Sequence, residues 1–130
     1  MPRATGTFEV KLAPQSAGDA GDAVGRFTID KQISGDLTGT GKGEMLSAGS
    51  PATGSAGYVA IECVTGTLAA REGTFALQHT GIMHNGKNDL LIQVVPGSGT
   101  GGFAGLTGTF AIVITDGKHS YQFDYELAAG

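Results

Sequence analysis

Apolar and polar residues alternate along most of the chain with a period of two. Near the N-terminus, for example, Phe8, Val10 and Leu12 fall on one side and the charged Glu9 and Lys11 on the other. Such alternation is typical of β-strands with one buried face, and no segment keeps the helical period over three turns. The pattern predicts about eight strands, over residues 7–12, 26–33, 37–46, 58–68, 74–83, 90–95, 106–115 and 119–127.

Short turn motifs separate several of these segments. Asn85-Gly86 and Asp116-Gly117 predict two-residue hairpin turns, because type I′ turns need a positive φ at both central positions. Residues 71–73 (Arg-Glu-Gly) carry a weaker signal of the same kind. The expected strand order is therefore an antiparallel one in which neighbours in sequence pair.

Three longer connections are rich in glycine or small residues. Residues 14–24 are expected to form a loop, and residues 47–57 and 96–105 are expected to close one end of the structure. The run Pro96–Gly102 only superficially resembles a phosphate-binding loop, since it lacks the Lys-Ser/Thr ending and no helical pattern follows it. We therefore expect a lid or a plain connection there.

The turns fix which residues face each other, and large side chains repeatedly fall opposite glycines. Such pairs suit a tightly curved sheet, where two large side chains would collide on the concave face. With 23 glycines in 130 residues, the chain is predicted to be all-β, a single domain over residues 1–130 that forms an eight-stranded antiparallel closed barrel. The predicted pairs include Phe110 with Phe123, Ile112 with Tyr121, Gly108 with Tyr125, His79 with Ile92, Val64 with His79, Lys31 with Gly39 and Ile29 with Gly41.

Glu62 and His79 are the candidate acid/base residues. The predicted register places both on the inward face, with His79 diagonal to Glu62 and within hydrogen-bond reach. A carboxylate in a mostly apolar barrel must be paired, neutralised or functional, because unpaired burial costs several kcal/mol. Two interpretations stand: a catalytic unit in which one group orients the other, or a structural ion pair with Glu62 at the rim in water.

Four further polar side chains share the inward face and are candidate substrate-binding residues: Tyr58, His119, Tyr121 and Tyr125. Their hydroxyl and imidazole groups are suited to holding a substrate oxygen. The alternative is that the tyrosines fill the core and direct their hydroxyls to the mouth of the barrel.

Composition excludes several classes of function. The formal net charge is −4 and the basic residues are scattered, which argues against a nucleic-acid partner. No apolar run approaches the ~20 residues that cross a membrane, so we expect no membrane partner and a cytoplasmic location. The lone Cys63 and the spacing of His79, His84 and His119 predict no metal site, and no motif indicates a cofactor.

The outward face carries apolar residues on neighbouring strands, including Val59, Ile61, Val95 and Val113. An apolar patch of this kind indicates a subunit interface. Because a closed barrel has no free strand edges, we expect a homo-oligomer that associates through a face or an end.

Seven stretches of the chain carry a further signal: residues 29–31, 34–37, 43–46, 54–62, 73–79, 94–101 and 119–125. They resemble a family of small, mostly bacterial proteins of unknown function whose fold is similar to plant allene oxide cyclase. The resemblance implies a barrel of the allene-oxide-cyclase and dirigent type, commonly oligomeric. Allene oxide cyclase converts an unstable fatty-acid epoxide to a cyclopentenone, but none of its catalytic residues can be aligned here.

Three functional hypotheses follow. The first is an isomerase or cyclase acting on an apolar epoxide, polyene or polyketide-like molecule, with Glu62 and His79 as acid/base and Tyr58 as oxygen ligand. The second is a non-catalytic carrier or sensor of an apolar metabolite that uses the same cavity. The third is an oligomeric scaffold with a filled barrel, since eight strands enclose little more than their own side chains.

Overall fold

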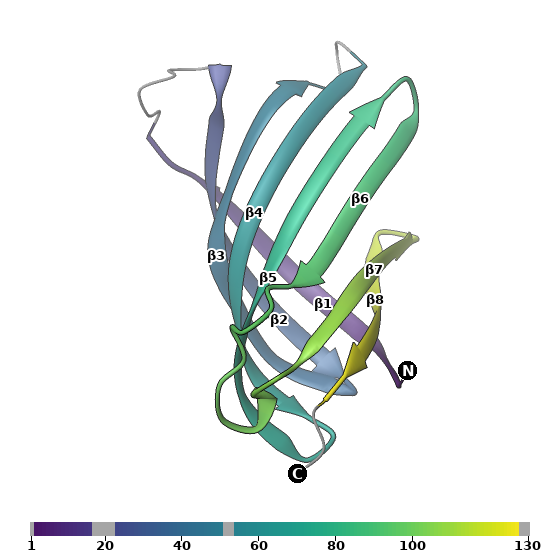
Figure 1. The fold of residues 1–130 in the computed structure, drawn as a ribbon. Helices are drawn as coiled ribbons and strands as arrows, with labels where there is room; N and C mark the ends of the chain where they lie inside the picture. Colours follow the sequence, from purple (N-terminus) through teal and green to yellow (C-terminus); the bar gives the residue numbers. More distant parts are fainter. Residues whose placement is uncertain (1, 17–22, 51–53, 128–130) are drawn as a thin grey trace.

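The chain folds into eight antiparallel strands that close into a barrel in sequence order (Figure 1). The computed structural model describes residues 2–16, 23–50 and 54–127. One short 3-10 helix, η3 (Gly101–Phe103), lies between the sixth and seventh strands. The strands are β1 (Arg3–Pro14), β2 (Gly25–Gly35), β3 (Leu37–Ser50), β4 (Ser55–Leu68), β5 (Arg71–His84), β6 (Lys87–Val94), β7 (Thr107–Thr115) and β8 (Lys118–Glu126).

The two strongest turn predictions are confirmed. Asn85 and Gly86 have φ values of 50° and 81°, and Asp116 and Gly117 have 53° and 76°. Positive φ at both central positions is what a type I′ hairpin requires. The registers that follow from these turns are also confirmed, including Phe110 opposite Phe123, Ile112 opposite Tyr121, Gly108 opposite Tyr125 and His79 opposite Ile92.

The predicted turn between β4 and β5 is wrong by two residues. The turn is formed by Ala69 and Ala70, with φ values of 52° and 64°, so that Val64 faces Phe75 rather than His79. Alanine seldom adopts positive φ, which is why the motif was not visible. Because the shift is even, every side chain keeps its predicted face.

The register of β2 against β3 is wrong by two residues. Lys31 faces Gly41 rather than Gly39, and Ile29 faces Gly43 rather than Gly41. The predicted pairing of a large residue with a glycine nevertheless holds, because glycines occupy alternate positions of β3. These glycines line the concave side of the sheet and leave room for side chains from both neighbours.

The two glycine-rich segments do not close the same end, contrary to the prediction. Residues 47–50 and 55–57 extend β3 and β4 into a long hairpin at the upper end in Figure 1, whereas residues 96–105 cross the lower end. There Phe103 is fully buried and packs edge-on against Phe75, with ring centroids 5.4 Å apart. The lower connection is therefore a packed plug. Of the predicted loop 14–24, residues 17–22 lie outside the described residues.

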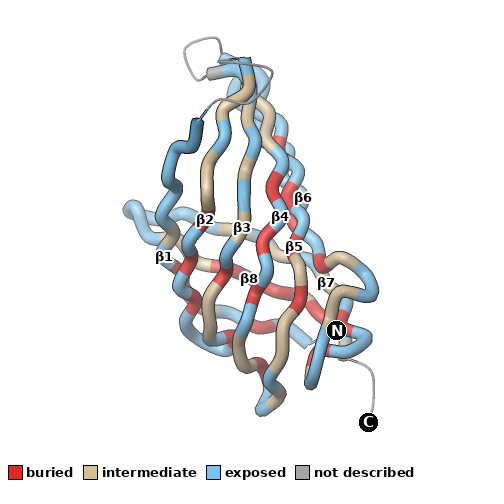
Figure 2. Tube along the Cα trace, turned by 90° about the vertical axis from the view of Figure 1, so that its left-hand side faces the viewer, coloured by how far each residue is buried: buried red, intermediate tan, exposed pale blue. Residues whose placement is uncertain are grey.

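The apolar core fills only the lower part of the barrel. Phe123 stacks on Phe110 at 4.1 Å and on Phe75 at 6.0 Å between ring centroids. Buried positions cluster around these rings, and the upper hairpins are mostly exposed or half-buried (Figure 2). The apolar core therefore does not fill the interior of the upper half.

Closure of the barrel between β6 and β7 rests on two residue pairs. Ile92 pairs with Phe110 and Gln93 with Thr109, and above them the two strands diverge (Figure 1). In the described chain, residues 87–91 of β6 have no ladder partner on this side. The expectation that closure removes every free edge is therefore met only in the lower half.

No helix in the described part of the chain has the length and apolar character needed to cross a membrane.

Candidate functional site

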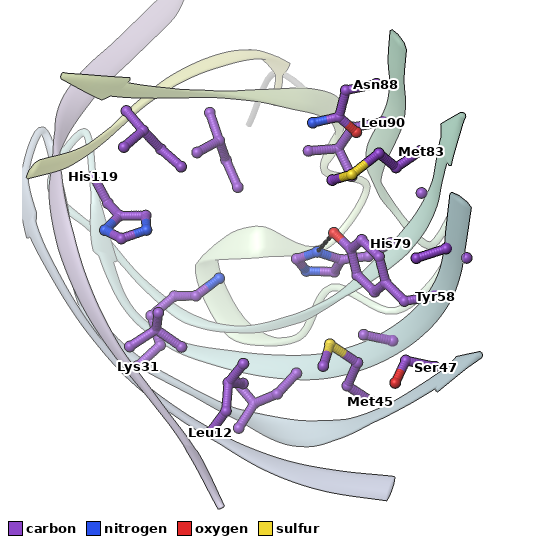
Figure 3. A pocket seen from close by; sticks show the side chains of 18 of the residues that line it. Leu12, Lys31, Met45, Ser47, Tyr58, His79, Met83, Asn88, Leu90 and His119 are labelled. Carbon is purple, nitrogen blue, oxygen red and sulfur yellow. Dashed lines mark hydrogen bonds between the residues drawn. The ribbon is translucent and has the colours of Figure 1, made fainter. Parts of the chain in front are cut away.

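A cavity of about 430 Å³ occupies the upper half of the barrel (Figure 3). It lies along the diverging strands β6 and β7, with Leu90 on one side and Ile114 on the other. Most of its lining is apolar, and its volume is within the ordinary range for small-molecule sites. The lining residues are Phe8, Val10, Leu12, Ile29, Lys31, Met45, Ser47, Ala56, Gly57, Tyr58, Ala60, His79, Gly81, Met83, Asn88, Leu90, Ile112, Ile114 and His119.

Glu62 is fully buried and contacts two of the residues that line this cavity. Its Oε1 accepts hydrogen bonds from His79 Nε2 and from Lys31 Nζ, each at 2.7 Å. The predicted contact between Glu62 and His79 is present, because the register differs from the predicted one by four residues, and this even shift keeps them diagonal on one face. Glu62 itself does not line the cavity, so only its two partners reach a ligand.

Glycines on β3 make the space for this carboxylate. Glu62 pairs with Gly43, and a Cβ added at Gly41 would collide with Glu62 Oε2. Oε2 is buried and has no hydrogen-bond partner among the described residues. The small residues of β3 are therefore part of the site as well as of the curvature.

The charge state of Glu62 follows from its contacts. Burial raises the pKa of Glu62, but the hydrogen bond from His79 and the charge and hydrogen bond of Lys31 outweigh it and lower the pKa overall. An ionised carboxylate only accepts, so the hydrogen-bond network assigns the proton to Nε2 of His79. In the neutral form of this tautomer, Nδ1 on the other side of the ring is unprotonated.

Tyr58 lies beside that nitrogen. Its hydroxyl is 3.5 Å from His79 Nδ1, a long contact that leaves the lone pair largely available. The Tyr58 ring packs over Gly81, where a Cβ would strike it. Burial, followed by the charge of Glu62, raises the pKa of Tyr58, so its hydroxyl stays protonated and able to donate.

Lys31 is the site residue that sequence reasoning missed. The predicted register pairs it with a glycine of the next strand and gives it no role; its side chain is 10% exposed and its Nζ lies 4.9 Å from the centroid of the Phe8 ring. A lysine among inward apolar residues needs a carboxylate partner, and Glu62 was the only inward carboxylate predicted. The need of Lys31 for a carboxylate partner was therefore the sequence signal that could have placed it beside Glu62.

The other predicted substrate-binding residues separate into two groups. His119 lines the cavity opposite Tyr58 and His79 (Figure 3). Tyr121 lies in the lower half, where its hydroxyl accepts from Leu37 N at 3.0 Å and is within 3.0 Å of the Ser34 and Leu37 carbonyl oxygens. Its hydrogen-bonding capacity is thus taken up by the β2–β3 turn. Tyr125 packs against Phe123 and is not among the cavity-lining residues.

The described residues contain no group of three His, Cys, Asp or Glu side chains placed to hold a metal ion. Cys63 is exposed on the outer face of β4. The polar side chains that line the cavity are those of Lys31, Ser47, Tyr58, His79, Asn88 and His119.

Comparison with known proteins assigns the family. The model of the family described as "Protein of unknown function (DUF3224)" matches residues 4–125. The chain belongs to the DUF3224 family. A crystal structure of a DUF3224 protein of unknown function from Shewanella oneidensis MR-1 is 47% identical, with a TM-score of 0.93, and the match covers 100% of this chain and 99% of that one. None of the curated proteins matches the chain.

The solved DUF3224 structure shares this fold, and neither comparison names an activity. The chemistry of the site follows from its side chains. A neutral imidazole held by a buried carboxylate is a general base with a fixed orientation. An ammonium group beside it, facing the same cavity, is a binding group for an electron-rich oxygen. The arrangement is suited to moving a proton on a molecule bound in the cavity.

Proposed function

We propose that this DUF3224 protein binds an apolar small molecule in the upper cavity and acts on it as an isomerase or cyclase by acid/base catalysis. His79 is the catalytic base, Glu62 positions it, and Tyr58 donates a hydrogen bond to the bound molecule. The observation that carries the proposal is the cavity of about 430 Å³ whose apolar walls end on His79 and Lys31.

The cost of burying Lys31, Glu62 and His79 supports a functional origin for this cluster. A buried ion pair is often no more stabilising than apolar residues of the same volume. A buried carboxylate with one oxygen that has no partner in the described part of the chain is a further cost to folding. A catalytic role would explain the cluster, because the exclusion of water from an apolar cavity strengthens the electrostatic interactions of the base with a ligand.

The similarity of the sequence to allene-oxide-cyclase-like barrels agrees with this proposal at the level of architecture alone, since one fold hosts many chemistries. A carrier or sensor of an apolar metabolite is the second candidate. It is favoured by the short pairing between β6 and β7, because Leu90 and Ile114 line the cavity on the parts of these strands that do not pair with each other. A carrier needs the cavity but does not need the free Nδ1 of His79.

Occupancy of the cavity is tested with two tryptophan variants. Ser47 lines the cavity, whereas its neighbour Ala48 is exposed on the outer face of the same strand. The chain has no tryptophan, so each variant carries one indole. The neutral apolar dye N-phenyl-1-naphthylamine is titrated into the wild type, Ser47→Trp and Ala48→Trp, and binding is followed by dye fluorescence.

We expect the dye to bind the wild type and Ala48→Trp, and to bind Ser47→Trp more weakly because the indole occupies its space. In Ala48→Trp the indole should be insensitive to the dye. Equal binding to all three proteins, or none to the wild type, would contradict a ligand cavity in the upper barrel. The variant His79→Asn distinguishes an enzyme from a carrier. It should still bind the dye but should lose the isomerase or cyclase activity.

A further inference from the structure

Lys31 has no role in the proposed acid/base pair, yet it is the one formally charged side chain among the described residues that line the cavity. Its Nζ carries three N–H donors. One is directed at Glu62 Oε1, and the described residues supply no second acceptor. In Figure 3 the amino group of Lys31 points into the space between His119 and His79. Neutralising Glu62 alone does not require this exposure to the cavity.

We infer that Lys31 binds the reacting oxygen of the substrate, and that the substrate is an apolar carbonyl compound with a removable proton on the carbon next to the carbonyl. This inference rests on the proposed function and names the substrate class of the same site. The polar end of the substrate meets Lys31 and His79, and its apolar part extends towards Leu12, Met45 and Met83.

The proton transfer is balanced by charges already present. His79 Nδ1 takes the proton, the electron pair of the broken C–H bond forms a C=C bond, and the carbonyl π pair moves onto oxygen to give an enolate. The imidazolium so formed lies 2.7 Å from the Glu62 carboxylate through Nε2, and the enolate oxygen lies against the Lys31 ammonium. Return of the proton to a different carbon of an unsaturated ketone completes an isomerisation, with no oxidant or reductant.

The shared Glu62 Oε1 explains why Lys31 and His79 lie close together. Glu62 Oε1 contacts Lys31 Nζ and His79 Nε2 at the same distance, so the cation and the base are held side by side. A base and an oxyanion-binding group must lie on one side of a substrate to act on adjacent atoms of it. The shared contact holds Lys31 Nζ beside the His79 ring without help from any ligand, and Nδ1 lies on the side of the ring towards Tyr58.

Hydrogen–deuterium exchange into 2-tetralone tests this inference, since that apolar ketone has acidic protons next to its carbonyl. The protein and the ketone are mixed in D₂O, and the signal of those protons is followed by ¹H NMR. The wild type should accelerate exchange, and Lys31→Met should lose roughly 100- to 1,000-fold of that acceleration, as for loss of one oxyanion-binding group. Lys42→Met is the matched control, because Lys42 pairs with Asp30 on the outer surface at 65% exposure, and its rate should be unchanged.

A second measurement on the wild type does not depend on whether Lys31→Met folds. 2-Naphthol has the shape of the tetralone enol, and its absorbance distinguishes the neutral form from the anion. Bound to the wild type at neutral pH, it should be ionised, with its oxygen on Lys31. Circular dichroism establishes the folded fraction of each variant at the temperature of the exchange assay.

Absence of exchange by the wild type, un-ionised bound naphthol, or equal exchange by folded Lys31→Met would each overturn the inference. Failure of the inference is distinguishable from failure of the proposed function. If N-phenyl-1-naphthylamine still binds in a manner sensitive to Ser47→Trp, the cavity binds apolar molecules and only the carbonyl assignment is wrong. If the dye does not bind, the proposed function itself fails.

Discussion

Removing one member of the buried cluster should cost more stability than removing two. Lys31→Met leaves the Glu62 carboxylate, fully buried, with His79 as its single partner. Glu62→Met leaves the Lys31 ammonium, whose side chain is 10% exposed, without a counter-charge, and leaves His79 Nε2 without an acceptor. Each single substitution therefore leaves an uncompensated charge in the interior.

The magnitude follows from the burial. Loss of one partner of a buried ion pair costs about 3–5 kcal/mol, and we expect both single variants in that range. In Lys31→Met/Glu62→Met no buried charge is left unpaired. The remaining loss is the His79 donor, worth about 1–3 kcal/mol. The double variant should thus be more stable than either single variant.

Urea unfolding followed by circular dichroism at neutral pH measures the four proteins of this double-mutant cycle. Single losses that simply add in the double variant would refute the reasoning, because they would mean that Lys31 and Glu62 do not interact in the folded protein. Lys42→Met again serves as the control, since exposed ion pairs contribute about 0–1 kcal/mol.

Three further predictions concern pH, the plug and assembly. The pKa of Glu62 is lower in the folded than in the unfolded chain. The ionised carboxylate therefore contributes its full stabilisation above the ordinary glutamate pKa, and this contribution is lost as the pH falls through the lowered value. Urea unfolding across acidic pH should show that the difference in unfolding free energy between the wild type and Glu62→Met becomes smaller in this pH range. Phe103→Ala should lower the free energy of unfolding by about 3–5 kcal/mol, measured by urea titration, and a loss below 1 kcal/mol would mean that the lower connection is not packed. Light scattering at micromolar concentration should show an oligomer that Ile61→Lys dissociates, because Val59 and Ile61 are 51% and 55% exposed on the outer face; a monomeric wild type would contradict this.

The architecture was predictable from the sequence because its signals are local. Alternation with period two, and the Asn85-Gly86 and Asp116-Gly117 turns, determine the strands and two registers. The turn at Ala69-Ala70 was not predictable, since tertiary contacts must impose positive φ on alanine. The face assignments survived because registers that keep the hydrophobic face inward differ by two residues.

The site was predictable only in part. Tyr58 and Glu62 share one face of β4 by parity, and every register of β5 that keeps the hydrophobic faces together places His79 on that face as well. Lys31 comes from β2, with β3 between it and Glu62, and the two meet across Gly41. That contact depends on the curvature of the sheet, which the local pattern does not specify. The functional separation of His119 from Tyr121 likewise depends on which half of the barrel is filled, and Phe103 in the lower connection decides that.

Long-range ¹H–¹⁵N correlation of the histidine side chains, with and without N-phenyl-1-naphthylamine, tests the central claim most directly. His79 should show a protonated Nε2 and an unprotonated Nδ1, and its Nδ1 signal should move when the dye enters the cavity. His84 is the internal control, because it lies at the exposed tip of β5 and bonds to Ser55 and Asn85; its signals should stay in place. His79→Asn assigns the resonances. A His79 ring protonated on Nδ1 alone, or signals of His79 that do not respond to bound dye, would contradict the account.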